Sequence, residues 1–266
     1  MVFHTGTPSG GLLFDGWVRA GAARGIRHVA YSRPGYGASD RRAGRTVADC
    51  VQDVAAVADE LEIGRFYAVG WSGGGPHALA CAALLGDRVL AAATLAGVAP
   101  YRAEGLDWLA GMGDENVAEF AAAEAGEPAL TEFLEAAAEE IVGAEADQLR
   151  EGLGGLLTDI DREVLTGEVG QYMVQSTDVG LGGGIAGWLD DDLAFIADWG
   201  FELGAIAAPV TVWQGEQDRM VPFAHGPWLV GHVAGARARL LPGEGHLSLV
   251  FNRYGDVLDE LIAAAG

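Results

Sequence analysis

The sequence contains no lysine, and this absence removes several kinds of chemistry at once. All sixteen basic residues among its 266 are arginine. The chain therefore has neither an amine for a Schiff base nor the lysine of a phosphate-binding loop. With 38 acidic residues, the formal net charge is −22. Nucleic acid is not expected as a partner, because phosphate binding needs a basic surface.

Long apolar runs, cysteines and metal-ligand patterns are also scarce. No stretch reaches the roughly 18 consecutive apolar residues of a membrane helix, and the first ten residues lack the charged start of a secretory signal. We therefore expect a cytoplasmic protein with no membrane partner. The two cysteines, Cys50 and Cys81, lie in helical patterns and are expected to be buried free thiols. No histidine pair has metal-ligand spacing beside a carboxylate, so we expect neither a metal nor a cofactor.

Short apolar runs alternate with helix-like patterns along most of the chain. Each run is bounded by glycine or proline and is too short for a helix, which favours buried strands. The runs lie at residues 27–32, 66–71, 91–98, 209–215 and 238–243. Alternating strands and helices predict an α/β fold with a mostly parallel, doubly wound sheet that carries helices on both faces.

This alternation stops between residues 101 and 200. Amphipathic helical stretches follow one another there, and no good strand interrupts them. The same segment holds 23 of the 38 acidic residues and three of the sixteen arginines. Pattern and charge therefore predict an acidic helical cap at 101–200, inserted into a core domain made of residues 1–100 and 201–266.

A glycine-rich turn, Gly70-Trp71-Ser72-Gly73-Gly74, follows the apolar run at 66–71 and opens a helical pattern. Its glycines do not match the dinucleotide-binding fingerprint, and no Gly-Lys-Ser/Thr follows. The spacing is G-x-S-x-G, which in a tight strand-to-helix turn lifts the serine hydroxyl above a sheet. By itself the pentapeptide leaves two interpretations open: Ser72 is a nucleophile, or the turn is a glycine hinge.

A serine nucleophile needs a histidine to take its proton and an acid to orient that histidine. "QGEQDRMVP" places Asp218 after the run at 209–215, and "LPGEGHLSLV" places His246 after the last run. Glu216 lies two positions before Asp218 and is a competing candidate for the acid. The order Ser, Asp, His along the chain is typical of one hydrolase architecture.

Five motifs in order now support a family resemblance: "FHTGTPSG", "SRPGYGASD", "GWSGGGPHAL", "GEQDRMVP" and "GEGHLSL". With them the chain resembles an α/β-hydrolase of the capped serine-hydrolase type. The resemblance implies Ser72 as nucleophile, His246 as general base and then acid, and Asp218 as the orienting carboxylate. The Gly-x-x-Asp pattern of the family, which runs here from Gly215 to Asp218, favours Asp218 over Glu216. The resemblance also implies an oxyanion hole formed by the backbone N–H groups of Gly73 and Thr7.

The chain departs from this family at its start. Relatives usually carry two further strands before the first motif, whereas only "MVF" precedes His4 here, so we expect these N-terminal strands to be missing. Either the start was placed too late, which we favour, or the protein tolerates a shortened sheet edge. Such an opening would leave an unpaired edge strand, so a homodimer is one expectation. Relatives also have adjacent His and Gly residues in the first motif, whereas here Thr5 separates His4 from Gly6. The assignment of Thr7 as an oxyanion donor depends on how this motif is aligned.

These features predict a serine hydrolase acting on a small ester, lactone or related carbonyl substrate. The acidic cap favours a neutral small-molecule substrate over an anionic one. Trp71 and Trp199 are candidate substrate contacts. Two alternatives stay open: an acyltransferase, lyase or carbon–carbon bond hydrolase with the same three residues, and a ligand-binding receptor without catalysis.

Overall fold

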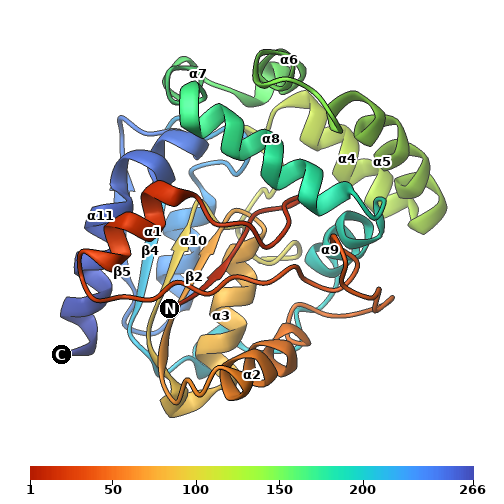
Figure 1. Cartoon of the computed structure of the whole chain (residues 1–266). Coiled ribbons are helices and arrows are strands. Elements are labelled where there is room, and N and C mark those ends of the chain that lie inside the picture. Colours follow the sequence, from red (N-terminus) through yellow and green to blue (C-terminus); the bar gives the residue numbers. More distant parts are fainter.

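The protein is built around a sheet of five parallel strands (Figure 1). The computed structural model describes residues 1–266. The strands are β1 (Val2–His4), β2 (Phe66–Trp71), β3 (Val89–Leu95), β4 (Val210–Gly215) and β5 (Arg237–Leu241), and they lie side by side in chain order. Parallel neighbours need long crossover connections, and helices supply them. The predicted α/β class with a parallel sheet is confirmed.

Four of the five predicted strands form close to their expected positions, but the one predicted at 27–32 does not. Only Val29 pairs there, through an isolated parallel bridge to Val2. The Phe3 N–H donates to the Val29 carbonyl at 2.8 Å, and the Val29 N–H donates to the Met1 carbonyl at 2.9 Å. β1 has only three residues, so it supplies too few backbone partners for a longer strand beside it.

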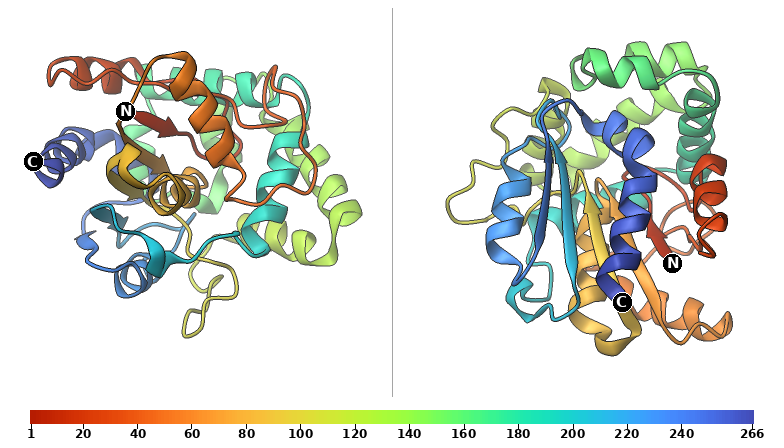
Figure 2. Two further views of the ribbon diagram at one scale, coloured as in Figure 1. Left: turned by 90° about the horizontal axis from the view of Figure 1, so that it is seen from below. Right: turned by 90° about the vertical axis from the view of Figure 1, so that its left-hand side faces the viewer.

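Helices cover both faces of the sheet (Figure 2). On one face lie α2 (Cys50–Glu60), α3 (Gly74–Leu84) and α10 (His225–His232), and on the other lie α1 (Asp15–Ala22) and α11 (His246–Ala265). Side chains alternate along each strand. In β2, Ala68 therefore packs toward α3 while Val69 packs toward α11. Two apolar cores result, which explains why the strands read as continuous apolar runs.

All the regular secondary structure between β3 and β4 is helical. The helices are α4 (Asp114–Ala125), α5 (Glu127–Ile141), α6 (Ala146–Gly152), α7 (Asp159–Val164), α8 (Gly167–Leu181) and α9 (Ala186–Ile196). Three short 3₁₀ turns lie at Gly86–Arg88, Gly154–Leu156 and Leu203–Ala205. Figure 1 shows α4 to α9 gathered at one end of the sheet. These six helices cover that end and are called the helical roof below.

Both cysteines are buried and free, as expected. None of the helices combines the length and apolar character that crossing a membrane demands.

Candidate active site

Ser72 lies in the sharp turn between β2 and α3. Its φ of 54° places a non-glycine residue in the left-handed region, a conformation that costs about 1–3 kcal/mol and persists only where its surroundings enforce it. Two backbone hydrogen bonds do so: the Ser72 N–H donates to the Leu95 carbonyl at 2.9 Å, and the Gly75 N–H donates to the Ser72 carbonyl at 2.8 Å. The side chain takes no part in holding this turn.

Two glycines of the motif make the turn sterically feasible. A Cβ added at Gly70 would collide with the carbonyl oxygen of Gly74, and a Cβ at Gly74 would collide with the carbonyl oxygen of His4. β1, β2 and the start of α3 therefore meet at backbone contact distance. This close approach is the physical reason for the spacing of the motif.

Replacing Gly74 with alanine is expected to destabilise the protein by about 1–3 kcal/mol, because the new methyl group meets backbone atoms that cannot move aside. Gly64→Ala is the matched control, since a Cβ there meets nothing within 4 Å. The free energy of unfolding from urea denaturation measures both. Equal losses in the two variants would show that the contact at Gly74 is not tight.

Asp218 and His246 are brought together by the loops after β4 and β5. Nδ1–H of His246 donates to Oδ2 of Asp218 at 2.8 Å. The backbone N–H groups of Met220 and Val221 donate to Oδ1 of Asp218 at 2.9 and 2.8 Å, which fixes the carboxylate. Glu216, the competing acid, is exposed and does not contact the histidine.

The electrostatics of this pair favour a protonated imidazole. Burial by itself lowers the pKa of His246, but the charge and hydrogen bond of Asp218 and the charge of Asp161 outweigh it. The net effect raises the pKa of His246 above its usual value. The ring can therefore stabilise a bound proton.

Asp161 is a residue that the sequence analysis missed. It comes from α7 and is fully buried. Its carboxylate accepts the backbone N–H groups of His246, Leu247 and Ser248 at 3.1, 2.9 and 2.9 Å. These are the first N–H groups of α11, which have no partner within the helix. A residue of the helical segment thus holds the helix turn that carries His246.

Gly73 and Thr7 meet beside Ser72. A Cβ added at Gly73 would lie 2.5 Å from Oγ1 of Thr7, and one added at Gly6 would lie 3.2 Å from Cβ of Ser72. The backbone N–H groups of Gly73 and Thr7 donate to no acceptor within the chain. Both are consequently free to bind an oxygen atom placed next to Ser72.

The loop that carries Thr7 is fixed by a buried carboxylate, Asp191, which the sequence analysis also missed. Thr7 Oγ1 and Tyr36 OH donate to its Oδ2 at 2.6 and 2.8 Å. Nη2 of Arg33 lies 2.5 Å from Oδ2, and Nη2 of Arg45 lies 2.6 Å from Oδ1. The visible signal was "WLDDDLAF", in which three acids occur within an otherwise apolar helical stretch.

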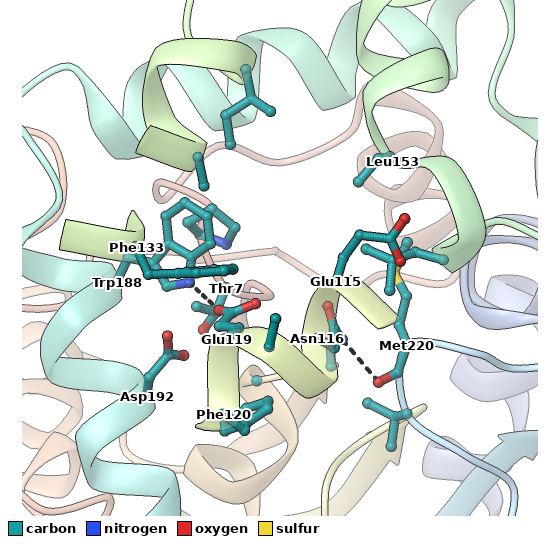
Figure 3. Close-up of a pocket in the computed structure, with 18 of the residues that line it drawn as sticks. Thr7, Glu115, Asn116, Glu119, Phe120, Phe133, Leu153, Trp188, Asp192 and Met220 are labelled. Carbon is teal, nitrogen blue, oxygen red and sulfur yellow. Dashed lines mark hydrogen bonds between the residues drawn. The ribbon is translucent and has the colours of Figure 1, made fainter. Parts of the chain in front are cut away.

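A cavity of about 360 Å³ opens next to Ser72, between the sheet and the helical roof (Figure 3). Ser72, Gly73 and Thr7 are among the residues that line it. Its apolar walls include Val98, Phe120, Phe133, Leu153, Leu156, Trp188 and Phe195. Its acidic lining residues are Glu115, Glu119, Glu140 and Asp192, and no arginine or histidine lines it. No group of three or more acidic, histidine or cysteine side chains is arranged to hold a metal ion.

The structure does not bring Trp71 or Trp199 to this cavity, contrary to expectation. Strand alternation directs Trp71 to the α1 and α11 face, where its ring lies 5.7 Å from the ring of His246. Trp199 is 4 % exposed and donates from Nε1 to the Phe195 carbonyl at 3.3 Å, below the roof. The tryptophan that lines the cavity is Trp188 of α9.

Comparison with known proteins agrees with this architecture. The model of the alpha/beta hydrolase fold family matches residues 1–252. No curated protein sequence matches the chain significantly. Among solved structures, the bromoperoxidase from Bacillus anthracis is 22% identical, with a TM-score of 0.70 over 98% of this chain and 91% of that one.

Two further solved structures have the same fold. The esterase from Exiguobacterium antarcticum is 17% identical, with a TM-score of 0.67 over 99% of this chain and 90% of that one. The enol-lactonase from Burkholderia xenovorans is 20% identical, with a TM-score of 0.63 over 98% and 90% of the two chains. At these identities the likeness shows the fold alone. Because the family model spans nearly the whole chain, the protein belongs to the α/β-hydrolase fold family.

Proposed function

We propose that the protein is a serine hydrolase that cleaves a small ester, lactone or related carbonyl substrate through an acyl-enzyme on Ser72. The observation that carries this proposal is the hydrogen bond of 2.8 Å between His246 and Asp218, at the same end of the sheet as the strained Ser72 turn. The named relatives include an esterase and a lactonase. Their activities agree with the proposal but do not decide whether the substrate is an ester, a lactone or a related carbonyl compound.

Five groups take part in the proposed reaction. Oγ of Ser72 attacks the substrate carbonyl carbon while His246 takes its proton, and Asp218 stabilises the imidazolium. The N–H groups of Gly73 and Thr7 bind the oxyanion, and such donors contribute about 3–4 kcal/mol each to transition-state stabilisation. His246 then protonates the leaving alkoxide, and an ester of Ser72 remains. His246 then deprotonates a water molecule, which attacks the carbonyl carbon of this ester. The acid leaves as His246 returns the proton to Oγ of Ser72.

The helical segment at 101–200 acts in this proposal as a cap. Cavity-lining residues come from α4, α5 and α9, so this segment supplies most of the wall that faces the substrate. Cap side chains would consequently set substrate preference, while the sheet supplies the chemistry. The absence of arginine and histidine from the lining supports the expectation that anionic substrates are disfavoured.

The pH dependence of ester hydrolysis tests the proposed roles. We expect kcat/KM for p-nitrophenyl butyrate to fall as pH falls through the raised pKa of His246, because only the neutral imidazole accepts a proton. Asp218→Asn should lower kcat by about 10⁴-fold, as loss of the orienting carboxylate does in serine proteases. It should also shift the acidic fall of kcat/KM to lower pH, because the charge of Asp218 that raises the pKa of His246 is gone.

Glu216→Gln serves as the matched control, because Glu216 is exposed and lies two residues before Asp218. It should leave both the rate and the acidic fall of kcat/KM unchanged. Rates measured between about pH 5 and 9 cover the titration of a histidine. A wild-type profile that is flat over this range would contradict a histidine base. Incorporation of ¹⁸O from labelled water into the acid product separates hydrolysis from acyl transfer.

A further inference from the structure

Two carboxyl groups meet in the wall of the cavity. Asp192 of α9 is 1 % exposed, whereas Glu119 of α4 is partly exposed to the cavity. Figure 3 shows their side chains close together beside the indole of Trp188. Both residues line the same cavity as Ser72. Neither has a role in the proposed chemistry.

The chain supplies this pair with fewer hydrogen-bond donors than it needs. Nε1–H of Trp188 donates to Oε1 of Glu119 at 2.6 Å. Oδ2 of Asp192 is buried, and no N–H group or hydroxyl of the chain donates to it. Leaving a buried carboxylate oxygen without a donor is costly. Asp192 and Glu119 can hydrogen-bond to each other only through a proton that one of them carries, so the pair needs either that proton or a donor from outside the chain.

Charge leads to the same conclusion. Burial raises the pKa of Asp192, and the negative charges of Glu119 and Asp191 raise it further, with Arg45 opposing them. Arg45 is already bound to Asp191 at 2.6 Å. Burial likewise raises the pKa of Glu119, while hydrogen bonds from Asp192 and from the Trp188 indole oppose this rise. Two adjacent carboxyl groups in such a place hold either a shared proton or a bound cation.

The surroundings suit an organic cation. The rings of Phe120, Phe133 and Trp188 line the same part of the cavity, and aromatic faces attract ammonium groups. Glu115 and Glu140 add negative charge to the lining.

The carboxyl pair also lies within reach of the reacting end. Asp192 is three positions before Phe195 on one face of α9. The ring of Phe195 would contact a Cβ added at Gly73, beside Ser72. A ligand a few atoms long therefore spans the distance from Ser72 to the carboxyl pair.

We propose that the cavity selects esters that carry a primary ammonium group at the end of a short apolar chain, with the ammonium bound between Glu119 and Asp192. This inference rests on the proposed serine-hydrolase function and names its substrate class. The ammonium supplies the donors that the two carboxyl groups lack. The aromatic walls enclose the methylene chain, and the carbonyl reaches Ser72.

Three p-nitrophenyl esters of matched length test the selection: 6-aminohexanoate, heptanoate and monoadipate. We expect kcat/KM for the aminohexanoate ester to exceed that of the heptanoate ester by about tenfold or more, as a charge-assisted hydrogen bond allows. The monoadipate ester should be the poorest. Asp192→Asn and Glu119→Gln should each remove the preference for the amine.

Glu139→Gln, an exposed residue of α5 outside the cavity, removes one charge from the same segment and should keep the preference. Activity on the heptanoate ester shows whether each variant has folded. A wild-type preference for heptanoate, or a ratio unchanged in both Asp192→Asn and Glu119→Gln, overturns the proposal.

Direct binding separates this proposal from the proposed function. In Ser72→Ala, titration calorimetry should detect hexylammonium binding more tightly than hexanol, and Asp192→Asn in that background should abolish the difference. If neutral esters are hydrolysed while hexylammonium has no advantage, the function stands and the ammonium site fails. If hexylammonium binds selectively while no ester is hydrolysed, the site stands and the assigned reaction fails.

Discussion

Replacing Ser72 with alanine is expected to lower kcat for ester hydrolysis by about 10⁶-fold, the size of effect seen when a serine protease loses its nucleophile. The serine oxygen forms the covalent bond in the proposed reaction, and no other hydroxyl is held in a comparable strained turn. Steady-state rates with p-nitrophenyl butyrate measure the loss. A residual rate within about tenfold of wild type would place the nucleophile elsewhere.

The same variant should fold normally. The Ser72 hydroxyl makes no hydrogen bond that alanine would lose, and the backbone hydrogen bonds to Leu95 and Gly75 remain. We expect the free energy of unfolding to stay within about 0.5 kcal/mol of wild type. A large loss of stability would make the kinetic result uninformative, so the urea transition is measured alongside the rate.

Replacing Asp191 with alanine is expected to cost about 3–5 kcal/mol of stability, the largest structural effect predicted here. The substitution leaves the guanidinium groups of Arg33 and Arg45 buried without a counter-charge. It also removes the acceptor of the Thr7 hydroxyl, so the loop carrying one proposed oxyanion donor loses its anchor. The free energy of unfolding near neutral pH and kcat for an ester measure the two consequences.

The contribution of Asp191 should vanish in acid. Burial opposes ionisation, but Arg33 and Arg45 outweigh it and hold the pKa of Asp191 well below its usual range. A carboxyl group whose pKa is depressed in the folded state stabilises the protein above its unfolded pKa of about 4. This stabilisation falls away as pH decreases toward the folded pKa. Wild type and Asp191→Ala should therefore converge in stability at low pH.

Asp190→Ala provides the control for Asp191. Asp190 pairs with Arg41, whose side chain is 38% exposed and can be hydrated when its partner is lost. We expect a loss less than half as large. Equal losses from the two neighbouring aspartates would contradict the assignment of Asp191 as the centre of the buried network.

The parts of the site that the sequence predicts are those set by local geometry. The turn around Ser72 needs small residues at fixed positions, so its spacing is visible in one pentapeptide. Asp218 and His246 each follow an apolar run, and parallel strands bring their carboxyl ends to one edge of the sheet. Chain order and loop position leave Glu216 and Asp218 equal, and the Gly-x-x-Asp pattern of the resembled family selects Asp218, which is the residue that His246 contacts.

The residues that the sequence could not predict depend on contacts between distant segments. Asp161 contacts N–H groups 85 residues farther along the chain, and Asp191 meets Arg33 across 158 residues. Composition showed only an acidic segment, which is usually a solvated surface. Three consecutive aspartates, residues 190–192, turn instead to Arg41, to the Arg33–Arg45 network and to Glu119. No pattern in the sequence distinguishes these three destinations.

The same limit explains two of the failed predictions of position. The run at 27–32 has the composition of a strand, but a partner of three residues leaves it one bridge. Trp71 is adjacent to Ser72 in sequence, yet strand alternation places its ring on the opposite face of the sheet from α3. Neighbours in sequence are not neighbours in the cavity.

The central claim is that Ser72 is the nucleophile, and covalent labelling tests it most directly. Intact-mass spectrometry of the protein after exposure to a fluorophosphonate should show a single adduct, and peptide mapping should place it on Ser72. The adduct should be absent in Ser72→Ala and should form far more slowly in His246→Ala. A protein that hydrolyses esters but forms no adduct, or forms one on another residue, would contradict the account.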